Sequence, residues 1–163
     1  MGIDIGTSAC KTAVFDLAGR VIASSIGGYA TKYPAHGFVE QDPEQWWEQV
    51  IKTIRACLRQ IDGREIAAIG VDGQSWSCIA VDEEGNVLYP NPIWQDVRSA
   101  EICREINRND WAGKVQERAG NSLQPFYSTG KILWIKHHEP AVYQRARWFL
   151  QSNSYIVYRL TGR

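Results

Sequence analysis

The chain has 163 residues, of which 44% are hydrophobic, and this size suits one average domain or a piece of a larger protein. Eighteen basic and eighteen acidic residues cancel, so no net charge favours nucleic acid or an anionic membrane as a partner. No apolar run is long enough to span a bilayer, and the amino terminus leads straight into a predicted strand rather than a signal peptide. The four cysteines have no C-x-x-C spacing, so we expect no zinc site. We expect a cytoplasmic protein, in which these cysteines would be reduced and buried.

The first predicted elements form an antiparallel meander. Residues 2–5 read as a short buried strand, residues 11–15 as a second strand and residues 21–25 as a third. Small residues at positions 6–8 turn the chain between the first two strands. Because a strand rather than a helix follows this turn, it is neither a Rossmann dinucleotide site nor a P-loop.

This first turn carries groups that suit a polyphosphate. Gly6 allows a ligand to approach the backbone closely, Thr7 and Ser8 offer hydroxyl and N–H groups, and Lys11 offers a cation. Asp4, at the end of the strand, can hold Mg²⁺ through water, because Mg²⁺ prefers oxygen ligands and keeps several waters. A solvated hairpin turn without a ligand explains the same residues equally well.

A helix is predicted next. Asp42 is a suitable N-cap and Pro43 fits the first helical position, while Gly63 is expected to end the helix. Apolar residues at helical spacing predict one buried stripe, made of Trp47, Val50, Ile51, Ile54, Leu58 and Ile61. The continuous apolar run over residues 66–71 then predicts a parallel strand buried on both faces.

Shorter elements follow to the end of the chain. The patterns predict strands at 78–81, 87–89 and 148–150, and helices at 99–107, 110–119, 130–138, 140–145 and 153–160.

The turn after the apolar run suits a sugar. Gln74 can hydrogen-bond hydroxyl groups, and Trp76 can cover an apolar sugar face. The run Gly73-Gln74-Ser75-Trp76-Ser77 nearly matches the nucleophile elbow of serine hydrolases, but a strand rather than a helix follows it. Hydrolase chemistry is therefore disfavoured, and a wet turn beside a core tryptophan remains the alternative to a sugar contact.

A second aromatic and polar segment precedes the helix predicted at 99–107. Asp96 can accept hydrogen bonds from substrate hydroxyls while Trp94 stacks on the substrate, and Arg98 can pair with Asp96. The alternative is a helix cap stabilised by an ion pair. We favour the functional interpretation, because a tryptophan beside an acid–base pair is not needed to cap a helix.

Five segments taken together resemble the FGGY family of carbohydrate kinases. They are Asp4–Lys11, similar to D-x-G-T-[ST]-x-x-[KR]; Glu40–Trp47, similar to E-Q-[DN]-P-x-x-W-W; Pro92–Arg98, similar to A-I-x-W-x-D-x-R; Lys131–Trp134, similar to K-L-x-W; and Tyr158–Gly162, which carries the family L-T-G. Their order and spacing agree across all 163 residues. Jointly these motifs are specific, although each alone is weak.

The resemblance implies an α/β fold of the actin/hexokinase-like (ribonuclease H-like) class, with a mixed sheet flanked by helices. It implies transfer of the γ-phosphoryl group of ATP to a hydroxyl of a sugar or polyol, with Mg²⁺. The residues that it assigns to sites are Gly6, Thr7, Ser8 and Lys11 for phosphate, Asp4 for the metal, and Gln74, Ser75, Trp76, Trp94, Asp96 and Arg98 for the acceptor.

The chain departs from the family pattern in two respects. The catalytic aspartate of a later G-D-x-x-A segment, the adenosine motif and the second domain are absent. We therefore expect residues 1–163 to be the N-terminal part of the first, sugar-binding domain of a longer kinase, inactive alone and without a catalytic residue of its own. The substrate turn keeps Gly73-Gln74 of the xylulokinase G-Q-M-H-G but lacks the Arg–Glu pair of the glycerol kinase N-Q-R-E-T. A xylulokinase-like enzyme is the nearest expectation, with another ketose, a polyol or a sugar acid left open.

The expected partners are ATP and a small sugar or polyol, without nucleic acid or membrane, and a homodimer is left open. One alternative is a non-catalytic module that binds sugar or nucleotide. Another is a ribonuclease H-like, metal-dependent nuclease that uses Asp4 and Asp72. Two-metal chemistry needs several clustered acids, so this alternative is the weaker one.

Overall fold

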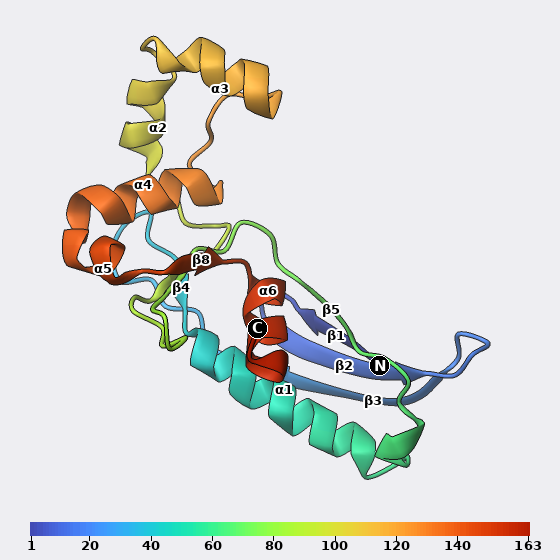
Figure 1. The fold of residues 1–163 in the computed structure, drawn as a ribbon. Helices are drawn as coiled ribbons and strands as arrows, with labels where there is room; N and C mark the ends of the chain where they lie inside the picture. The colour runs from blue at the N-terminus through green and yellow to red at the C-terminus, as the bar shows by residue number, and fades with distance from the viewer. The chain divides into compact units, whose positions relative to one another are not determined.

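The computed structural model describes all residues, 1–163, and they form two compact units. Unit 1 contains Met1–Thr31, Asp42–Gln74 and Ser152–Arg163, and unit 2 contains Lys32–Gln41 and Ser75–Gln151 (Figure 1). None of the helices combines the length and the apolar character that crossing a membrane requires.

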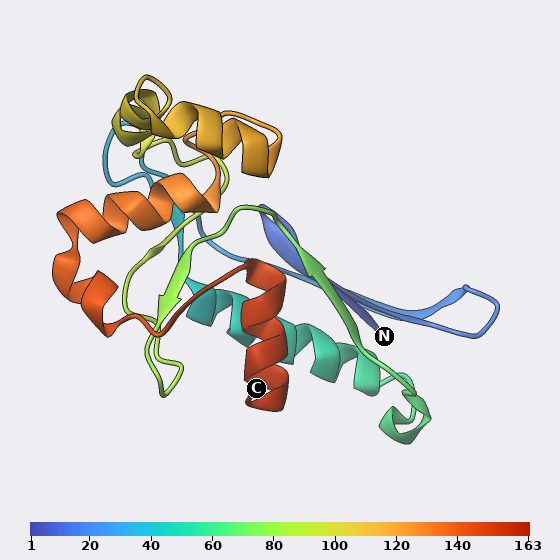
Figure 2. The same ribbon diagram turned by 45° about the horizontal axis from the view of Figure 1, so that its top comes forward.

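Unit 1 is built on a four-stranded mixed sheet with the strand order β3-β2-β1-β5. Strands β1 (Gly2–Ile5), β2 (Ala9–Phe15) and β3 (Val21–Gly28) pair antiparallel, which confirms the predicted meander. Strand β5 (Gly70–Gly73) pairs parallel with β1. The hairpin between β2 and β3 extends away from the rest of the sheet (Figure 2).

Helix α1 (Pro43–Leu58) covers one face of this sheet, but with a different side than predicted. Asp42 caps it as expected, since its side chain accepts the N–H of Glu44 at 2.9 Å. The residues that it buries are Pro43, Trp46, Val50, Thr53 and Cys57, so only Val50 of the predicted stripe is fully buried.

Polar contacts explain why the predicted stripe of α1 was wrong. The hydroxyl oxygens of Thr53 and Thr12 lie 2.8 Å apart, and Cys57 Sγ lies 3.7 Å from the main-chain oxygen of Thr12. Small polar side chains therefore make hydrogen bonds to each other between α1 and the sheet, whereas the apolar Leu58 is exposed. The most hydrophobic stripe of α1 lies on the neighbouring side of the helix, so hydrophobicity alone predicts the wrong buried side.

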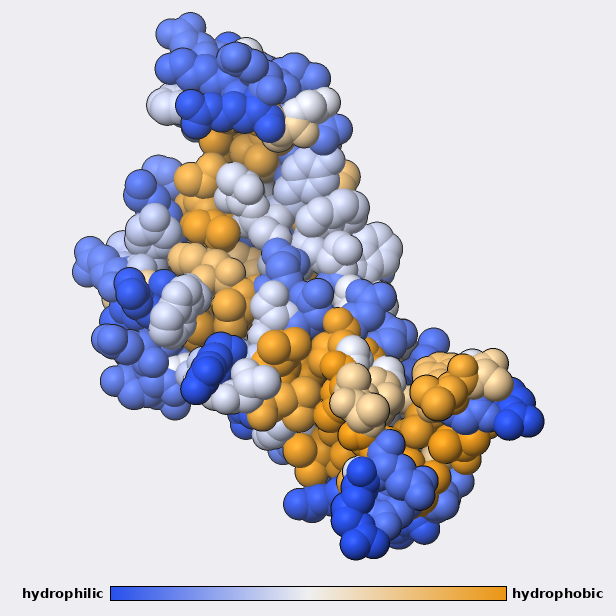
Figure 3. All heavy atoms as spheres, turned by 45° about the vertical axis from the view of Figure 1, so that its right-hand side comes forward, coloured by the Kyte–Doolittle hydropathy of each residue, from blue (hydrophilic) through white to orange (hydrophobic).

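The strand predicted over residues 66–71 is parallel as expected, but it begins only at Gly70, and its expected burial on both faces was wrong. The strand spans Gly70–Gly73 and lies at the edge of the sheet, where only β1 pairs with it. Ile69, just before it, remains exposed, and so do Phe15, Ile22 and Ile26 on the other strands. Figure 3 shows apolar residues exposed over this part of the molecule.

Two further details complete unit 1. Helix α1 ends at Leu58, before the expected Gly63, which instead begins the short 3₁₀ helix η1 (Gly63–Glu65). Helix α6 (Ser152–Thr161) packs against β5, with the hydroxyl of Ser152 donating to the carbonyl of Gln74 at 2.8 Å.

Unit 2 combines four helices with two small antiparallel pairs of strands. The helices are α2 (Ala100–Ile106), α3 (Trp111–Ala119), α4 (Ser128–His138) and α5 (Pro140–Arg145), close to the predicted positions. The strand pairs are β4 (Glu40–Gln41) with β7 (Asn91–Pro92), and β6 (Ile79–Val81) with β8 (Trp148–Leu150). The strand predicted at 87–89 was wrong, because these residues make only an isolated bridge between Val87 and Val81.

The start of α4 is held close to α2. A Cβ atom at Gly130 would lie 2.7 Å from Ser99 Oγ and 2.9 Å from Cys103 Sγ, so a larger residue would push the helices apart. The next residue, Lys131, is completely buried.

Candidate functional site

The turn between β1 and β2 is small and internally fixed. The N–H of Gly6 donates to the carbonyl of Ala9 at 3.1 Å, and the hydroxyl of Tyr29 donates to the carbonyl of Gly6. Burial raises the pKa of Tyr29 far above its usual value, so this hydroxyl keeps its proton. A Cβ at Gly6 would lie 3.2 Å from the oxygen of Ala9, which explains why glycine suits this turn.

A row of charged residues crosses the sheet beside this turn. Ile3 and Ile5 are buried, so Asp4 between them points to the opposite face, away from α1. In the strand register, Asp4 lies opposite Lys11 on β2 and beside Asp72 on β5. Directly paired residues have Cβ atoms about 4.5–5.5 Å apart, so one cation and two carboxylates are neighbours there.

These carboxylates fit one kind of metal site. Within these 163 residues, no group of three or more His, Cys, Asp or Glu side chains is placed to hold a metal ion. Two oxygen-bearing side chains do suit Mg²⁺, which keeps several waters and takes further ligands from substrate phosphates. Asp4 and Asp72 therefore fit a water-mediated Mg²⁺ site rather than an all-protein one.

Unit 2 carries an aromatic cluster in which the exposed Trp76 packs against the half-buried Phe126 and Tyr127. The ring of Trp76 lies 5.0 Å from that of Phe126 and 5.3 Å from that of Tyr127, and Trp76 is 40% exposed. The sequence analysis missed Phe126 and Tyr127, although two adjacent aromatic residues just before a helix were the available signal. Trp94, also 40% exposed, is the second predicted tryptophan of this unit.

Lys131 was also missed as a site residue, and the motif Lys131–Trp134 was its only signal. Its ammonium group donates to the carbonyl of Trp76 at 2.8 Å and to that of Ile93 at 2.6 Å. Burial lowers the pKa of Lys131 to about 8, although the charge of Asp96 opposes this shift.

Asp96 and Arg98 form a buried ion pair. The guanidinium of Arg98 donates to Asp96 Oδ2 at 2.7 Å and to Glu40 Oε1 at 2.6 Å, and the N–H of Val39 also donates to Asp96 Oδ2 at 2.7 Å. Burial by itself would lower the pKa of Arg98, but its bonds to Asp96 and Glu40 hold the pKa above its usual value. This geometry gives Asp96 a structural role, and its contact with a substrate stays a prediction.

The ring systems around Arg98 complete this buried site. Its guanidinium carbon lies 4.0 Å from the ring centre of Phe38 and 4.9 Å from that of Trp134. Such stacking suits the flat guanidinium, and a lysine would not reproduce it.

The remaining predicted residues, Gln74 and Ser75, are adjacent in the chain but belong to different units. Gln74 is buried, belongs to unit 1, and donates its N–H to the carbonyl of Ile5 at 2.7 Å. Ser75 is exposed and begins a segment of unit 2. The predicted acceptor residues are therefore divided between the two units, with Ser75, Trp76, Trp94, Asp96 and Arg98 in unit 2.

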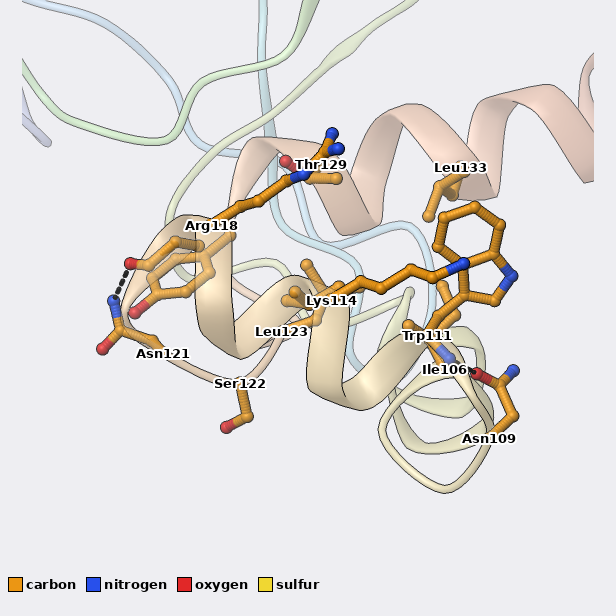
Figure 4. A pocket seen from close by; sticks show the side chains of 13 residues that line it. Ile106, Asn109, Trp111, Lys114, Arg118, Asn121, Ser122, Leu123, Thr129 and Leu133 are labelled. Carbon is orange, nitrogen blue, oxygen red and sulfur yellow. Dashed lines mark hydrogen bonds between the residues drawn. The ribbon is translucent and has the colours of Figure 1, made fainter.

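The helices of unit 2 also enclose an open hollow of about 850 Å³ (Figure 4). Its lining is mainly apolar and includes Leu123 and Leu133, with the ammonium of Lys114 4.5 Å from the ring centre of Trp111. None of the predicted site residues lines this hollow, which shares only Tyr127 with the Trp76 cluster.

Comparison with known proteins places the chain in a family. The family described as "FGGY family of carbohydrate kinases, N-terminal domain" matches residues 1–163. A xylulose kinase from Staphylococcus xylosus is 33% identical and a glycerol kinase from Brucella ovis is 32% identical, each over 99% of this chain and 34% of the relative. The crystal structure of gluconate kinase from Lactobacillus acidophilus superposes with a TM-score of 0.92 at 29% identity, over 99% of this chain and 33% of that one.

These matches confirm the expected actin/hexokinase-like α/β fold. The chain spans about a third of the length of the relatives that it matches. By its full-length match to the family's N-terminal domain and by the solved structures that share its fold, the chain belongs to the FGGY family of carbohydrate kinases.

Proposed function

We propose that the chain is the N-terminal part of an ATP-dependent carbohydrate kinase, within its first, sugar-binding domain. Family membership supports the class of reaction. The observation that carries the proposal is the row Lys11–Asp4–Asp72 beside a small glycine turn, which joins a cation for phosphate to carboxylates for Mg²⁺. The four cysteines are free and buried, in keeping with a proposed cytoplasmic location.

The phosphate-binding group would be Gly6, Thr7, Ser8 and Lys11. Lys11 is exposed on the face that carries Asp4, so its ammonium is free to meet a phosphate oxygen. Bound Mg²⁺ would neutralise phosphate charge, and Asp4 would orient it through water. Phosphoryl transfer depends mainly on positioning and charge stabilisation, so these few groups suit the task.

The acceptor would contact aromatic and polar groups near Trp76. Trp76 and Trp94 expose ring surface on which the C–H face of a sugar can stack, and Phe126 extends the surface beside Trp76. Gln74 and Ser75 would supply hydrogen bonds to hydroxyl groups. We propose that Asp96 and Arg98 lie behind this contact surface and hold residues 92–98 in place, because both side chains are buried.

The acceptor is proposed to be a ketose, with D-xylulose first. Gly73-Gln74 agrees with the xylulokinase turn, and the relatives include a xylulose kinase, a glycerol kinase and a gluconate kinase. Trp76 replaces the histidine of that turn, so a polyol or a sugar acid is the next candidate. The general base would lie outside these 163 residues.

The proposal is tested by ADP release from the full-length kinase with ATP, Mg²⁺ and a panel of ketoses, polyols and sugar acids. Activity with at least one acceptor is expected, and Trp76→Ala should raise the KM of that acceptor while leaving the KM of ATP unchanged. A folded enzyme that binds ATP but phosphorylates no member of the panel would overturn the proposed function and favour a non-catalytic binding module.

A further inference from the structure

Trp76 has a backbone conformation that is unusual for a tryptophan. Its φ angle is +60°, and it is the only residue other than glycine with a positive φ. This left-handed region is disfavoured for a bulky side chain, because Cβ approaches the carbonyl oxygen. Such a conformation persists only where surrounding contacts hold it, and it is commonest at functional sites.

The first turn of α4 supplies those contacts. The ammonium of Lys131 donates to the carbonyl of Trp76 at 2.8 Å, and the hydroxyl of Ser128 donates to the carbonyl of Ser77 at 2.9 Å. The side chain of Gln151 in turn donates to Ser128 Oγ at 2.8 Å, which orients this hydroxyl. Two consecutive peptide groups of the strained turn are thereby fixed from one helix.

The same ammonium reaches the second tryptophan segment. Lys131 donates to the carbonyl of Ile93 at 2.6 Å, and this carbonyl belongs to the peptide bond that leads into Trp94. A single fully buried cation therefore joins the backbones of both exposed tryptophans. Burying an ammonium is costly compared with burying a methionine of similar length, so a purely structural need would be met more simply by an apolar residue.

We propose that Lys131 and Ser128 form a clamp that positions Trp76 and Trp94 for the acceptor, with Lys131 as a positioning residue. The claim that these tryptophans contact the acceptor rests on the proposed function. The clamp itself depends only on hydrogen bonds within unit 2. Neither Lys131 nor Ser128 touches the substrate in this scheme. Each acts through the backbone of the residue that does.

Fluorine NMR of the chain labelled with 5-fluorotryptophan tests the clamp without any activity. The chain has seven tryptophans, and the signals of Trp76 and Trp94 are assigned from Trp→Phe variants. Lys131→Met should move both signals, whereas Ser128→Ala should move that of Trp76 but not that of Trp94. Lys136→Met, an exposed lysine of the same helix, is the matched control and should move neither.

Each outcome decides the inference. Should Lys131→Met fail to fold, Ser128→Ala still separates the two signals. A folded variant whose Trp76 signal stays in place, or one in which all seven signals move together, would overturn the clamp. In the full-length kinase, Lys131→Met should raise the acceptor KM by about tenfold or more with the ATP KM unchanged. Inactive wild-type enzyme would refute the proposed function, while the fluorine signals would still decide the clamp.

Discussion

Replacing Asp96 with alanine should lower the free energy of unfolding by about 3–5 kcal/mol, the range for breaking a buried ion pair by removing one partner. Asp96 is fully buried and accepts the main-chain N–H groups of Val39 and Arg98 as well as the guanidinium of Arg98. After its removal, Glu40 is the remaining acidic side chain that pairs with the buried guanidinium of Arg98. The N–H of Val39 also loses its acceptor, which alone costs about 1–3 kcal/mol.

Urea denaturation followed by circular dichroism measures this loss. Arg64→Ala is the matched control, because the Asp62–Arg64 pair is as short, at 2.6 Å, but its arginine side chain is 90% exposed. This control should leave the urea midpoint almost unchanged. A folded Asp96→Ala chain with a wild-type midpoint would refute the structural role and return Asp96 to the list of direct substrate ligands.

Three further predictions concern backbone packing, protonation and turnover. Gly73→Ala should destabilise the chain by about 1–3 kcal/mol in urea denaturation, because the new Cβ would lie 2.5 Å from Ser152 Oγ and 3.2 Å from a main-chain oxygen of β1. Gly27→Ala should cost less, since its closest contact is the flexible end of Gln49, and equal losses would contradict this reasoning. The pKa of Lys131, about 8, lies below its unfolded value of 10.5, so the unfolded chain binds more protons between these two pH values. The free energy of unfolding should therefore rise with pH in this range. Urea midpoints that rise by the same amount in Lys131→Met would refute this explanation. The 163-residue chain alone should release no ADP with ATP and any acceptor, and measurable turnover would show that the general base lies within it.

Local patterns were sufficient to predict most of the elements. The meander of β1 to β3, the Asp42–Pro43 start of α1 and the parallel pairing of β5 follow from alternation, capping and a run of apolar residues. The buried side of α1 did not follow, because Thr53 satisfies its hydroxyl against Thr12 and only the folded chain brings the two together. The exposure of β5 follows from its position at the edge of the sheet, and strand order cannot be predicted from a local pattern.

The candidate site was predictable by residue type but not by geometry. Motif spacing led to Asp4 and Lys11, and the strand register places them side by side. No local pattern indicates that Trp76 has a positive φ, or that Lys131 reaches its carbonyl across 55 positions of the chain. A long-range contact of this kind also buries Asp96, which accepts the N–H of Val39 from 57 positions away, and no local pattern predicts that burial.

The most direct test of the proposed kinase is detection of the transferred phosphate. Phosphorus NMR of the full-length protein with ATP, Mg²⁺ and D-xylulose, or the best acceptor of the panel, should show a sugar phosphomonoester forming as ADP appears. Lys11→Met should lower kcat/KM by about tenfold or more without unfolding the protein, since Lys11 is exposed and its proposed role is to bind phosphate. Absence of any phosphorylated product, or a Lys11→Met enzyme with unchanged kcat/KM, would contradict the account.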